Sequence, residues 1–199
     1  TEQWITGRHT AVGMALHAGA DWIHAVDFER MLRWLETHPH EVTSVIEQMQ
    51  SCDVLVVGRT PAAYATHAQA LIQTEAISNA VFSHVLGRKM DFSAGCRGFS
   101  RAAAAWILRN SPPVDAIGTD SEWIVLAQRG GFTIDYMEVD GLSWEVPDHH
   151  QATVSDAARQ REIAQAYDAD ANNWRFRLDF AQRIVHAGLD ALTRELAEH

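Results

Sequence analysis

The sequence predicts an α/β protein in which helices flank a mostly parallel sheet and a helical C-terminal tail follows it. Short apolar runs at residues 22–26 and 53–59 are typical of strands buried on both faces, as in a parallel sheet. Helical hydrophobic patterns separate and follow these runs, so we expect right-handed crossovers through helices. From residue 153 the pattern is helical, which predicts a tail rather than more sheet.

The composition is that of a globular domain with an acidic balance. The chain has 199 residues, 47% of them hydrophobic, which is enough to build the core of one domain. A formal net charge of -10 with 16 scattered Lys and Arg residues argues against nucleic-acid binding. No apolar run approaches the roughly 18 residues of a membrane-spanning helix. Cys52 and Cys96 lack metal-ligand spacing, so we expect free thiols and a cytoplasmic protein.

In the first half of the chain, hydrophobic periodicity predicts helices around the two strands. Three short helices are expected, at residues 9–17, 28–36 and 40–50. Asp27 is placed to end the first strand and to cap the second of these helices. A longer helix is predicted to begin at Thr66 as N-cap and to end at Gly87 as C-cap.

The second half of the chain is predicted to add two more helices and the remaining strands. Residues 91–101 contain two glycines and two arginines, which favours a loop. Helices are expected at 101–108 and 118–130, a strand at 132–139, and a shorter edge strand at 141–147. The amphipathic run 174–198 carries no recognisable chemistry, and we expect it to pack on the core or to form a homodimer.

Two acidic residues stand where a parallel sheet would bind ligands. Asp27 and Glu29 follow the first strand, and ligands of open α/β sheets collect at the carboxyl ends of strands. Their oxygens suit a phosphate-bound divalent cation. The alternative is that Asp27 only caps the helix and Glu29 only favours the helix dipole. Gly7 and Arg8, before a helix, would let a nucleotide approach closely and would meet a phosphate.

Taken in order, these motifs resemble those of the nucleotide-sugar glycosyltransferases of the GT-A fold, especially the family-2-like enzymes. The resemblance covers roughly residues 7–147. It rests on the following segments of this sequence: Gly7-Arg8, Asp27-Phe28-Glu29, residues 53–59, residues 94–99 and Thr119-Asp120-Ser121-Glu122. It implies a Rossmann-related catalytic core at residues 1–152, with most of the first βαβ unit absent, and a helical extension at 153–199. Three explanations of the absent unit stay open: the donor pocket is incomplete, the chain is a fragment of a longer protein, or another subunit completes the pocket.

The resemblance also implies roles for individual residues. A nucleotide-sugar donor would be held through Mn²⁺ or Mg²⁺ by Asp27 and Glu29, where Glu replaces the second Asp of the family motif. His149 or His150 would add a further metal ligand. The remaining donor-binding residues would be Gly7, Arg8, Gly95 and Arg97.

The reaction implied is transfer of a hexose to a small hydroxylated acceptor. In inverting enzymes Asp120, or second Glu122, would act as the general base. In a retaining enzyme Asp120 would instead orient the acceptor. A capping box, Thr119-x-x-Glu122, is an alternative explanation of Glu122 alone.

Two other classes of protein stay open at this point. A non-catalytic relative would use the same cleft for binding or assembly, and the short N-terminal part of the pattern favours it. A sugar nucleotidyltransferase shares the acidic metal site, but it should carry a glycine-rich basic loop near its first strand, and the sequence has none there. Titration with nucleotide sugars, with and without manganese, separates the enzyme from the binding protein.

Overall fold

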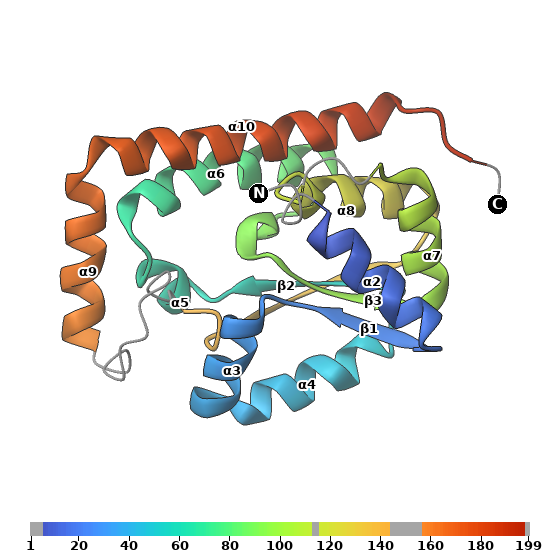
Figure 1. The fold of residues 1–199 in the computed structure, drawn as a ribbon, viewed down its shortest axis with the longest axis horizontal. Helices are drawn as coiled ribbons and strands as arrows, with labels where there is room; N and C mark the ends of the chain where they lie inside the picture. The colour runs from blue at the N-terminus through green and yellow to red at the C-terminus, as the bar shows by residue number, and fades with distance from the viewer. Residues whose placement is uncertain (1–5, 113–115, 144–156, 198–199) are drawn as a thin grey trace.

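The computed structural model describes residues 6–112, 116–143 and 157–197. It is 65% helical, with one small mixed sheet of four strands (Figure 1). The prediction of a mostly parallel sheet flanked by helices is therefore wrong. Helices dominate the protein, and the sheet is a thin layer among them.

The sheet contains β1 (Trp22–Ala25), β2 (Val54–Arg59), β3 (Cys96–Ser100) and β4 (Ile134–Val139). The strand order is β1-β3-β2-β4. Only β2 and β4 run parallel, whereas β3 is antiparallel to both of its neighbours. The second predicted strand is confirmed as the fully buried β2, and the strand predicted at 132–139 as β4.

The unexpected strand is β3, in the segment that was predicted to be a loop. Its sequence, CRGFS, has no apolar run, yet all five residues are buried. Gly98 explains part of this, because a Cβ there would lie 2.3 Å from Met49 Cγ. The missing side chain lets α4 lie closely over the strand. Burial of Arg97 is possible because its guanidinium donates to backbone carbonyl groups.

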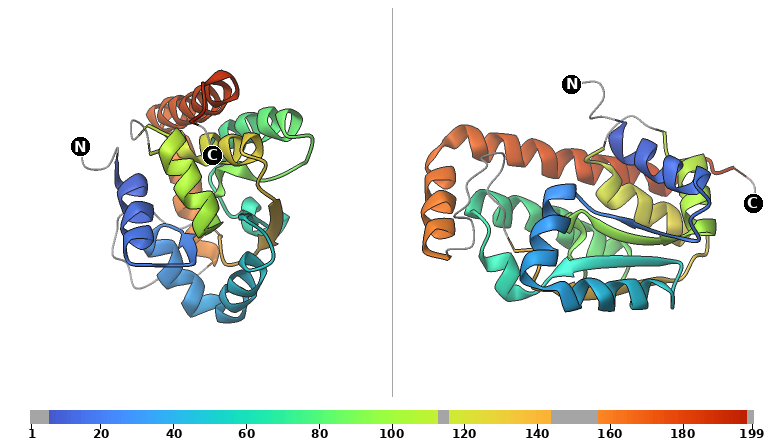
Figure 2. Two further views of the ribbon diagram at one scale, coloured as in Figure 1. Left: turned by 90° about the vertical axis from the view of Figure 1, so that its right-hand side faces the viewer. Right: turned by 60° about the horizontal axis from the view of Figure 1, so that its bottom comes forward.

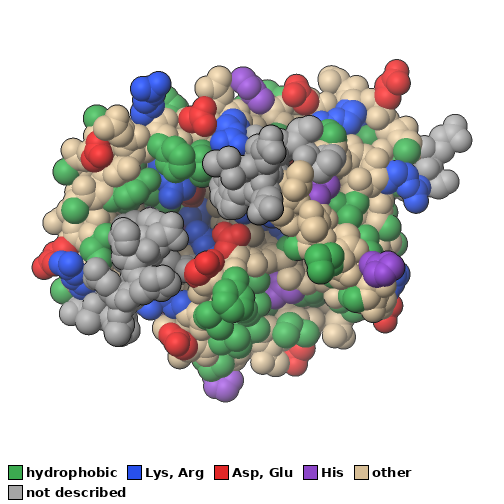
Figure 3. Space-filling view, viewed as in Figure 1, with side chains coloured by type: hydrophobic (Ala, Val, Ile, Leu, Met, Phe, Trp, Pro, Cys, Tyr) green, Lys and Arg blue, Asp and Glu red, His purple; other side chains and the backbone are tan. Residues whose placement is uncertain are grey.

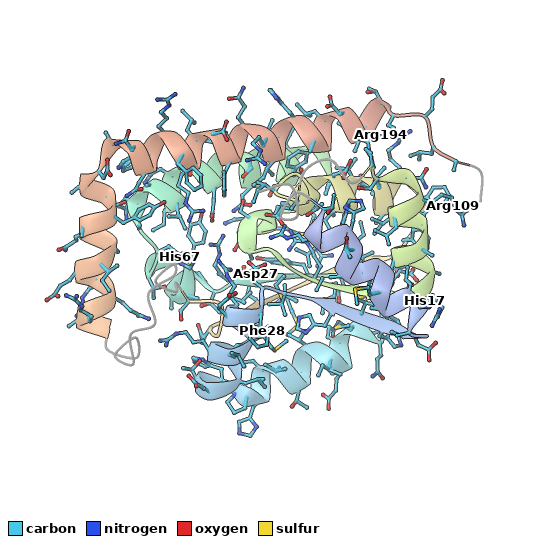
Figure 4. The ribbon with its side chains drawn as sticks, viewed as in Figure 1. His17, Asp27, Phe28, His67, Arg109 and Arg194 are labelled. Atoms are coloured by element: carbon cyan, nitrogen blue, oxygen red, sulfur yellow. The ribbon has the colours of Figure 1, made fainter. Side chains whose placement is uncertain are left out.

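The insertion of β3 moves β1 to the edge of the sheet. Of the four residues of β1 only Ile23 is buried, and Trp22 is 36% exposed. The prediction of a central strand buried on both faces is therefore wrong for this segment. The carboxyl end of β1 nevertheless points Asp27 toward the middle of the molecule (Figure 4).

Helices cover both faces of the sheet (Figure 2). Successive residues of β2 point to opposite faces, so Val54 and Val56 join one hydrophobic core and Leu55 and Val57 another. The first core is covered by α2, α6, α7, α8 and α10, and the second by α3 and α4. The helices are α2 (Gly7–His17), α3 (Phe28–Thr37), α4 (Pro39–Met49), α5 (Pro61–Ala65), α6 (Gln69–Val85), the 3-10 turn η1 (Phe92–Ala94), α7 (Arg101–Asn110), α8 (Thr119–Arg129), α9 (Ala157–Ala169) and α10 (Ala171–Thr193).

The long helix α6 does not begin at Thr66, contrary to the prediction. Thr66 follows α5, and its hydroxyl donates to the carbonyl of Ala63 at 2.6 Å. The backbone N–H groups of Gln69 and Ala70 instead donate to the carboxylate of Asp168, each at 2.8 Å. A residue from the C-terminal part of the chain therefore caps α6, and its negative charge suits the helix N-terminus.

The tail helix α10 lies along α6 and α8 (Figures 1 and 2). The hydroxyl of Ser121 in α8 donates to the carbonyl of Ile184 at 2.5 Å. At Gly188 a Cβ would lie 2.2 Å from Phe82 Cζ, so the glycine allows α10 to approach α6 closely. Packing on the core is therefore confirmed for this helix, and the homodimer stays a prediction.

The sheet has no strand directly after β4 in the described part of the chain. Of the edge strand predicted at 141–147, only 141–143 are described, and these form no strand. Within the described ranges, no helix has the length and apolar character needed to cross a bilayer.

Candidate functional site

A cavity of about 560 Å³ opens where α2, α3, α6, α8, α10 and the turn η1 meet. This volume lies in the range of small-molecule sites. Figure 3 shows acidic and basic side chains gathered at a hollow near the middle of this face. Six residues that the sequence singled out line the cavity: Gly7, Arg8, Asp27, Glu29, Gly95 and Asp120.

Arg8, in the first turn of α2, is the centre of this arrangement. Its Nη1 donates to Asp120 Oδ1 at 2.6 Å. The same nitrogen lies 3.1 Å from Thr119 Oγ1 and 3.1 Å from the carbonyl oxygen of Ala116. Its Nη2 is 3.8 Å from Asp27 Oδ1. One guanidinium thus joins the start of α2, the end of β1 and the start of α8.

Gly95 lies directly against this cluster. It follows η1 with a φ of +70°, in the left-handed region that favours glycine. A Cβ here would be 3.3 Å from Arg8 Nη2 and 4.0 Å from Asp120 Oδ1. The backbone conformation therefore favours glycine, and a side chain here would also press lightly on Arg8.

Asp27 and Glu29 stand at the mouth of the cavity. Asp27 occupies the N-cap position of α3, but its side chain makes no capping hydrogen bond. The predicted N-cap position of Asp27 is therefore confirmed, but capping does not account for its carboxylate, and the position of Glu29 still fits the helix-dipole alternative. With 52% of its side chain exposed, its carboxylate remains available to a ligand, and Glu29 lies in the first turn of the same helix.

The predicted metal ligands in the described residues are limited to these two carboxylates, which both border the cavity and stand two positions apart at the start of α3. Within the described residues, no group of three or more His, Cys, Asp or Glu side chains is arranged to hold a metal ion. Two carboxylates fit Mg²⁺ or Mn²⁺ only when phosphate oxygens and water complete the shell, as is common for phosphate-bound magnesium. His149 and His150, predicted as further ligands, lie outside the described residues.

Arg97 does not line the large cavity. Its side chain is buried and donates to the carbonyl oxygens of Phe92, Cys96 and Asp120, the last at 3.0 Å. It borders a smaller cavity of about 210 Å³ that also touches Arg8. In this position Arg97 ties η1 and β3 to the start of α8 and so fixes the backbone that carries Asp120.

Asp120 and Glu122 point to different surroundings, because residues two apart on a helix do not share a face. Asp120 borders the cavity, whereas Glu122 does not. Glu122 accepts hydrogen bonds from Ser111 Oγ and Arg194 Nη1, both at 2.5 Å. Arg194 lies at the far end of α10 from Asp27 (Figure 4). The capping box is wrong, since Glu122 binds these partners and Gly118 is the N-cap.

The opposite wall of the cavity was missed by sequence reasoning. It comes from α6 and α10, through Leu71, Thr74, Glu75, Arg177, Phe180, Ala181 and Ile184. The four residues from α10 share one face, at the helical spacing i, i+3, i+4 and i+7. The signal available in the sequence was an arginine on the apolar stripe of the tail helix.

A buried charge network supports this wall from behind. Arg59 at the end of β2 donates through Nε and Nη2 to Asp91, at 2.7 and 2.8 Å, and through Nη2 to Glu75 at 2.7 Å. Its guanidinium carbon lies 4.4 Å from the ring centre of Tyr64. Burial disfavours the ionised form of Asp91, but the hydrogen bonds and charge of Arg59 outweigh it and lower the pKa of Asp91 to about 2.

Comparison of the chain with protein-family models, with curated proteins and with solved structures gave no match. Function must therefore be argued from the geometry of the site itself.

Proposed function

We propose that this chain transfers a hexose from a nucleotide diphosphate sugar to a small hydroxylated acceptor. The observation that supports the proposal is convergence. Of the eight described residues that the sequence singles out for the site, six border one cavity: Gly7, Arg8, Asp27, Glu29, Gly95 and Asp120. Arg97 and Glu122 do not border it, but the six that do come from four separate stretches of the sequence.

The donor end of the proposed site lies at Arg8, Asp27 and Glu29. A diphosphate leaving group gains negative charge as its bond to the sugar breaks, and positive charge placed there lowers the barrier. Arg8 is already paired with Asp120 and lies near Asp27, so it supplies little uncompensated charge. A divalent cation shared by Asp27, Glu29 and the diphosphate would supply it as a Lewis acid.

Asp120 is the proposed general base. Arg8 binds its Oδ1, and among the described residues none donates a hydrogen bond to its Oδ2. Oδ2 is thus left to accept the proton of the acceptor hydroxyl. As that proton leaves, the acceptor oxygen forms a bond to the sugar C1, and the bond from C1 to the diphosphate oxygen breaks. Arg8 holds the carboxylate in place and so acts as a positioning residue.

The test is a transfer assay with a panel of nucleotide sugars and hydroxylated acceptors in the presence of Mn²⁺. Asp120→Asn should bind the donor nearly as well as the wild type and lose transfer by about 100-fold or more, because the amide cannot take up the proton. Asp135→Asn, on β4 and away from the cavity, is the matched control and should keep full activity.

Two outcomes would contradict the proposal. One is that no nucleotide sugar binds, which favours a binding or assembly protein of another kind. The other is full transfer by Asp120→Asn, which removes the assigned base. Release of inorganic pyrophosphate from a nucleoside triphosphate would instead identify a nucleotidyltransferase.

A further inference from the structure

We propose that the acceptor carries an oxyanion, a carboxylate or a phosphate, and that Arg177 of α10 binds it in the wall of the cavity opposite Asp27. The identification of the bound molecule as an acceptor substrate rests on the proposed glycosyl transfer. The anion site itself is argued from the surroundings of Arg177 alone.

Arg177 is held in place without using most of its donors. Its Nε donates to the hydroxyl of Tyr167 at 3.1 Å. Its guanidinium carbon lies 5.5 Å from the ring centre of Phe180 and 5.9 Å from those of Tyr167 and Phe176. Aromatic rings at these distances attract the cation and restrict its motion. The two terminal nitrogens, with four N–H groups, have no hydrogen-bond partner among the described residues.

The carboxylates that could neutralise Arg177 are engaged elsewhere. Glu75 borders the same wall and feels the charge of Arg177, but Arg59 binds it at 2.7 Å, and no ion pair within 4.0 Å joins Glu75 to Arg177. Asp120 is bound by Arg8. Within the described part of the chain, Arg177 therefore faces the cavity with no carboxylate in ion-pair distance. A planar guanidinium with free terminal N–H groups matches a carboxylate or phosphate through paired hydrogen bonds.

The position of Arg177 suits an acceptor rather than the donor diphosphate. The carbonyl of Ile184, two helical turns further along α10, contacts Ser121 next to Asp120. Two turns correspond to about 10 Å along the helix axis. An acceptor bound through its anion at Arg177 would thus extend along Phe180 and Ala181, which also border the cavity, toward the proposed base.

The test uses three probes with the same carbon skeleton: glycerate, glycerol phosphate and uncharged glycerol. Each is titrated calorimetrically into the full chain, alone and with a nucleoside diphosphate and Mn²⁺. At least one anion should bind about tenfold or more tightly than glycerol, as charge-assisted hydrogen bonds imply. Comparison of glycerate with glycerol phosphate then shows whether the site binds a carboxylate or a phosphate more tightly.

Variants of α10 assign the effect to one side chain. Arg177→Gln should abolish the preference for the anions, and Arg177→Lys should keep part of it, because the charge remains without the planar fork. Arg175→Gln is the matched control, since Arg175 is exposed on the same helix and does not border the cavity. Circular dichroism and thermal unfolding check that each variant is folded.

The inference is overturned if neither anion binds more tightly than glycerol, or if Arg177→Gln keeps the preference. It fails separately from the proposed function. Anion binding that needs Arg177 but no response to any nucleotide sugar would leave the anion site standing and remove the glycosyl transfer. If donor binding and transfer to glycerol are the same with and without Arg177, the glycosyl transfer stands and the anion site is removed.

Discussion

Arg59 is a fully buried cation that is paired with two carboxylates. Its side chain has no exposed surface, and it binds Glu75 from α6 and Asp91 from the loop before η1. Removing it leaves two partly desolvated carboxylates facing each other without a cation. The buried guanidinium of Arg59 therefore joins the end of β2 to Glu75 in the wall of the cavity.

We predict that Arg59→Met lowers the free energy of unfolding by about 3–5 kcal/mol, because a buried pair is broken from one side. Arg88→Gln is the control, since its pair with Asp135 is well exposed and should contribute less than about 1 kcal/mol. Urea titration at neutral pH measures both. Equal and small losses would show that the Arg59 network carries no stability.

His24 predicts a dependence of stability on pH. Burial lowers its pKa from 6.5 to about 4 in the folded protein, where it lies 3.2 Å from the sulfur of Cys96. Between these pH values the unfolded chain binds a proton that the folded protein does not, so stability falls as the pH falls from about 6.5 to 4. His24→Gln should reduce that loss by up to about 3 kcal/mol.

The measurement is urea unfolding at a series of pH values for the wild type and His24→Gln. His40→Gln, at an exposed position of α4, is the matched control and should follow the wild type. If the free energy of unfolding depends on pH in the same way in the wild type and in His24→Gln, the lowered pKa of His24 is contradicted.

At the scale of the elements, two helical glycines make opposite predictions. Gly188→Ala should destabilise the protein by about 1–3 kcal/mol, because its Cβ would press on Phe82 and on Ser121 Oγ, 2.7 Å away. Gly13→Ala in α2 should be neutral or stabilising by up to about 1 kcal/mol, because its nearest neighbour would be Leu108 Cδ1 at 3.8 Å. Thermal unfolding of both variants tests the close packing of α10, and a stable Gly188→Ala would contradict it.

The sheet shows which elements local sequence could predict. The sequence predicts β2 because its first four residues, Val54 to Val57, form an unbroken apolar run within a strand whose six residues are all buried. β3 was missed because its burial depends on remote groups: Arg97 is satisfied by carbonyls across the fold, and Gly98 makes room for Met49. Once β3 is missed, the antiparallel pairing and the edge position of β1 cannot be predicted either.

For the molecule as a whole, the sequence could predict the residues on one side of the cavity but not those on the other. Arg8, Asp27, Gly95 and Asp120 stand in local motifs, so the sequence could suggest them before their contacts were known. Their arrangement around one guanidinium is a tertiary property. The wall from α6 and α10 depends on how the tail helix packs, and the one local signal of Arg177, its place on the apolar stripe of α10, does not show that it borders a cavity.

The convergence of these segments also predicts how a metal ion would bind. With two carboxylates from the described chain and no third ligand among those residues, the protein should bind Mn²⁺ weakly by itself. If phosphate oxygens of a bound nucleotide complete the shell, as the proposed function requires, Mn²⁺ and donor should each tighten the binding of the other by the same factor.

The metal-linked donor site is tested most directly by calorimetric titration of nucleotide sugars into the wild type, Asp27→Asn and Asp21→Asn, with and without Mn²⁺. Asp21 directly precedes β1, the strand after which Asp27 stands, and its side chain is exposed. Asp21→Asn is therefore the matched control. We predict Mn²⁺-dependent binding to the wild type and Asp21→Asn and a loss of about tenfold or more in Asp27→Asn. Metal-independent binding that is equal in all three proteins would contradict the account.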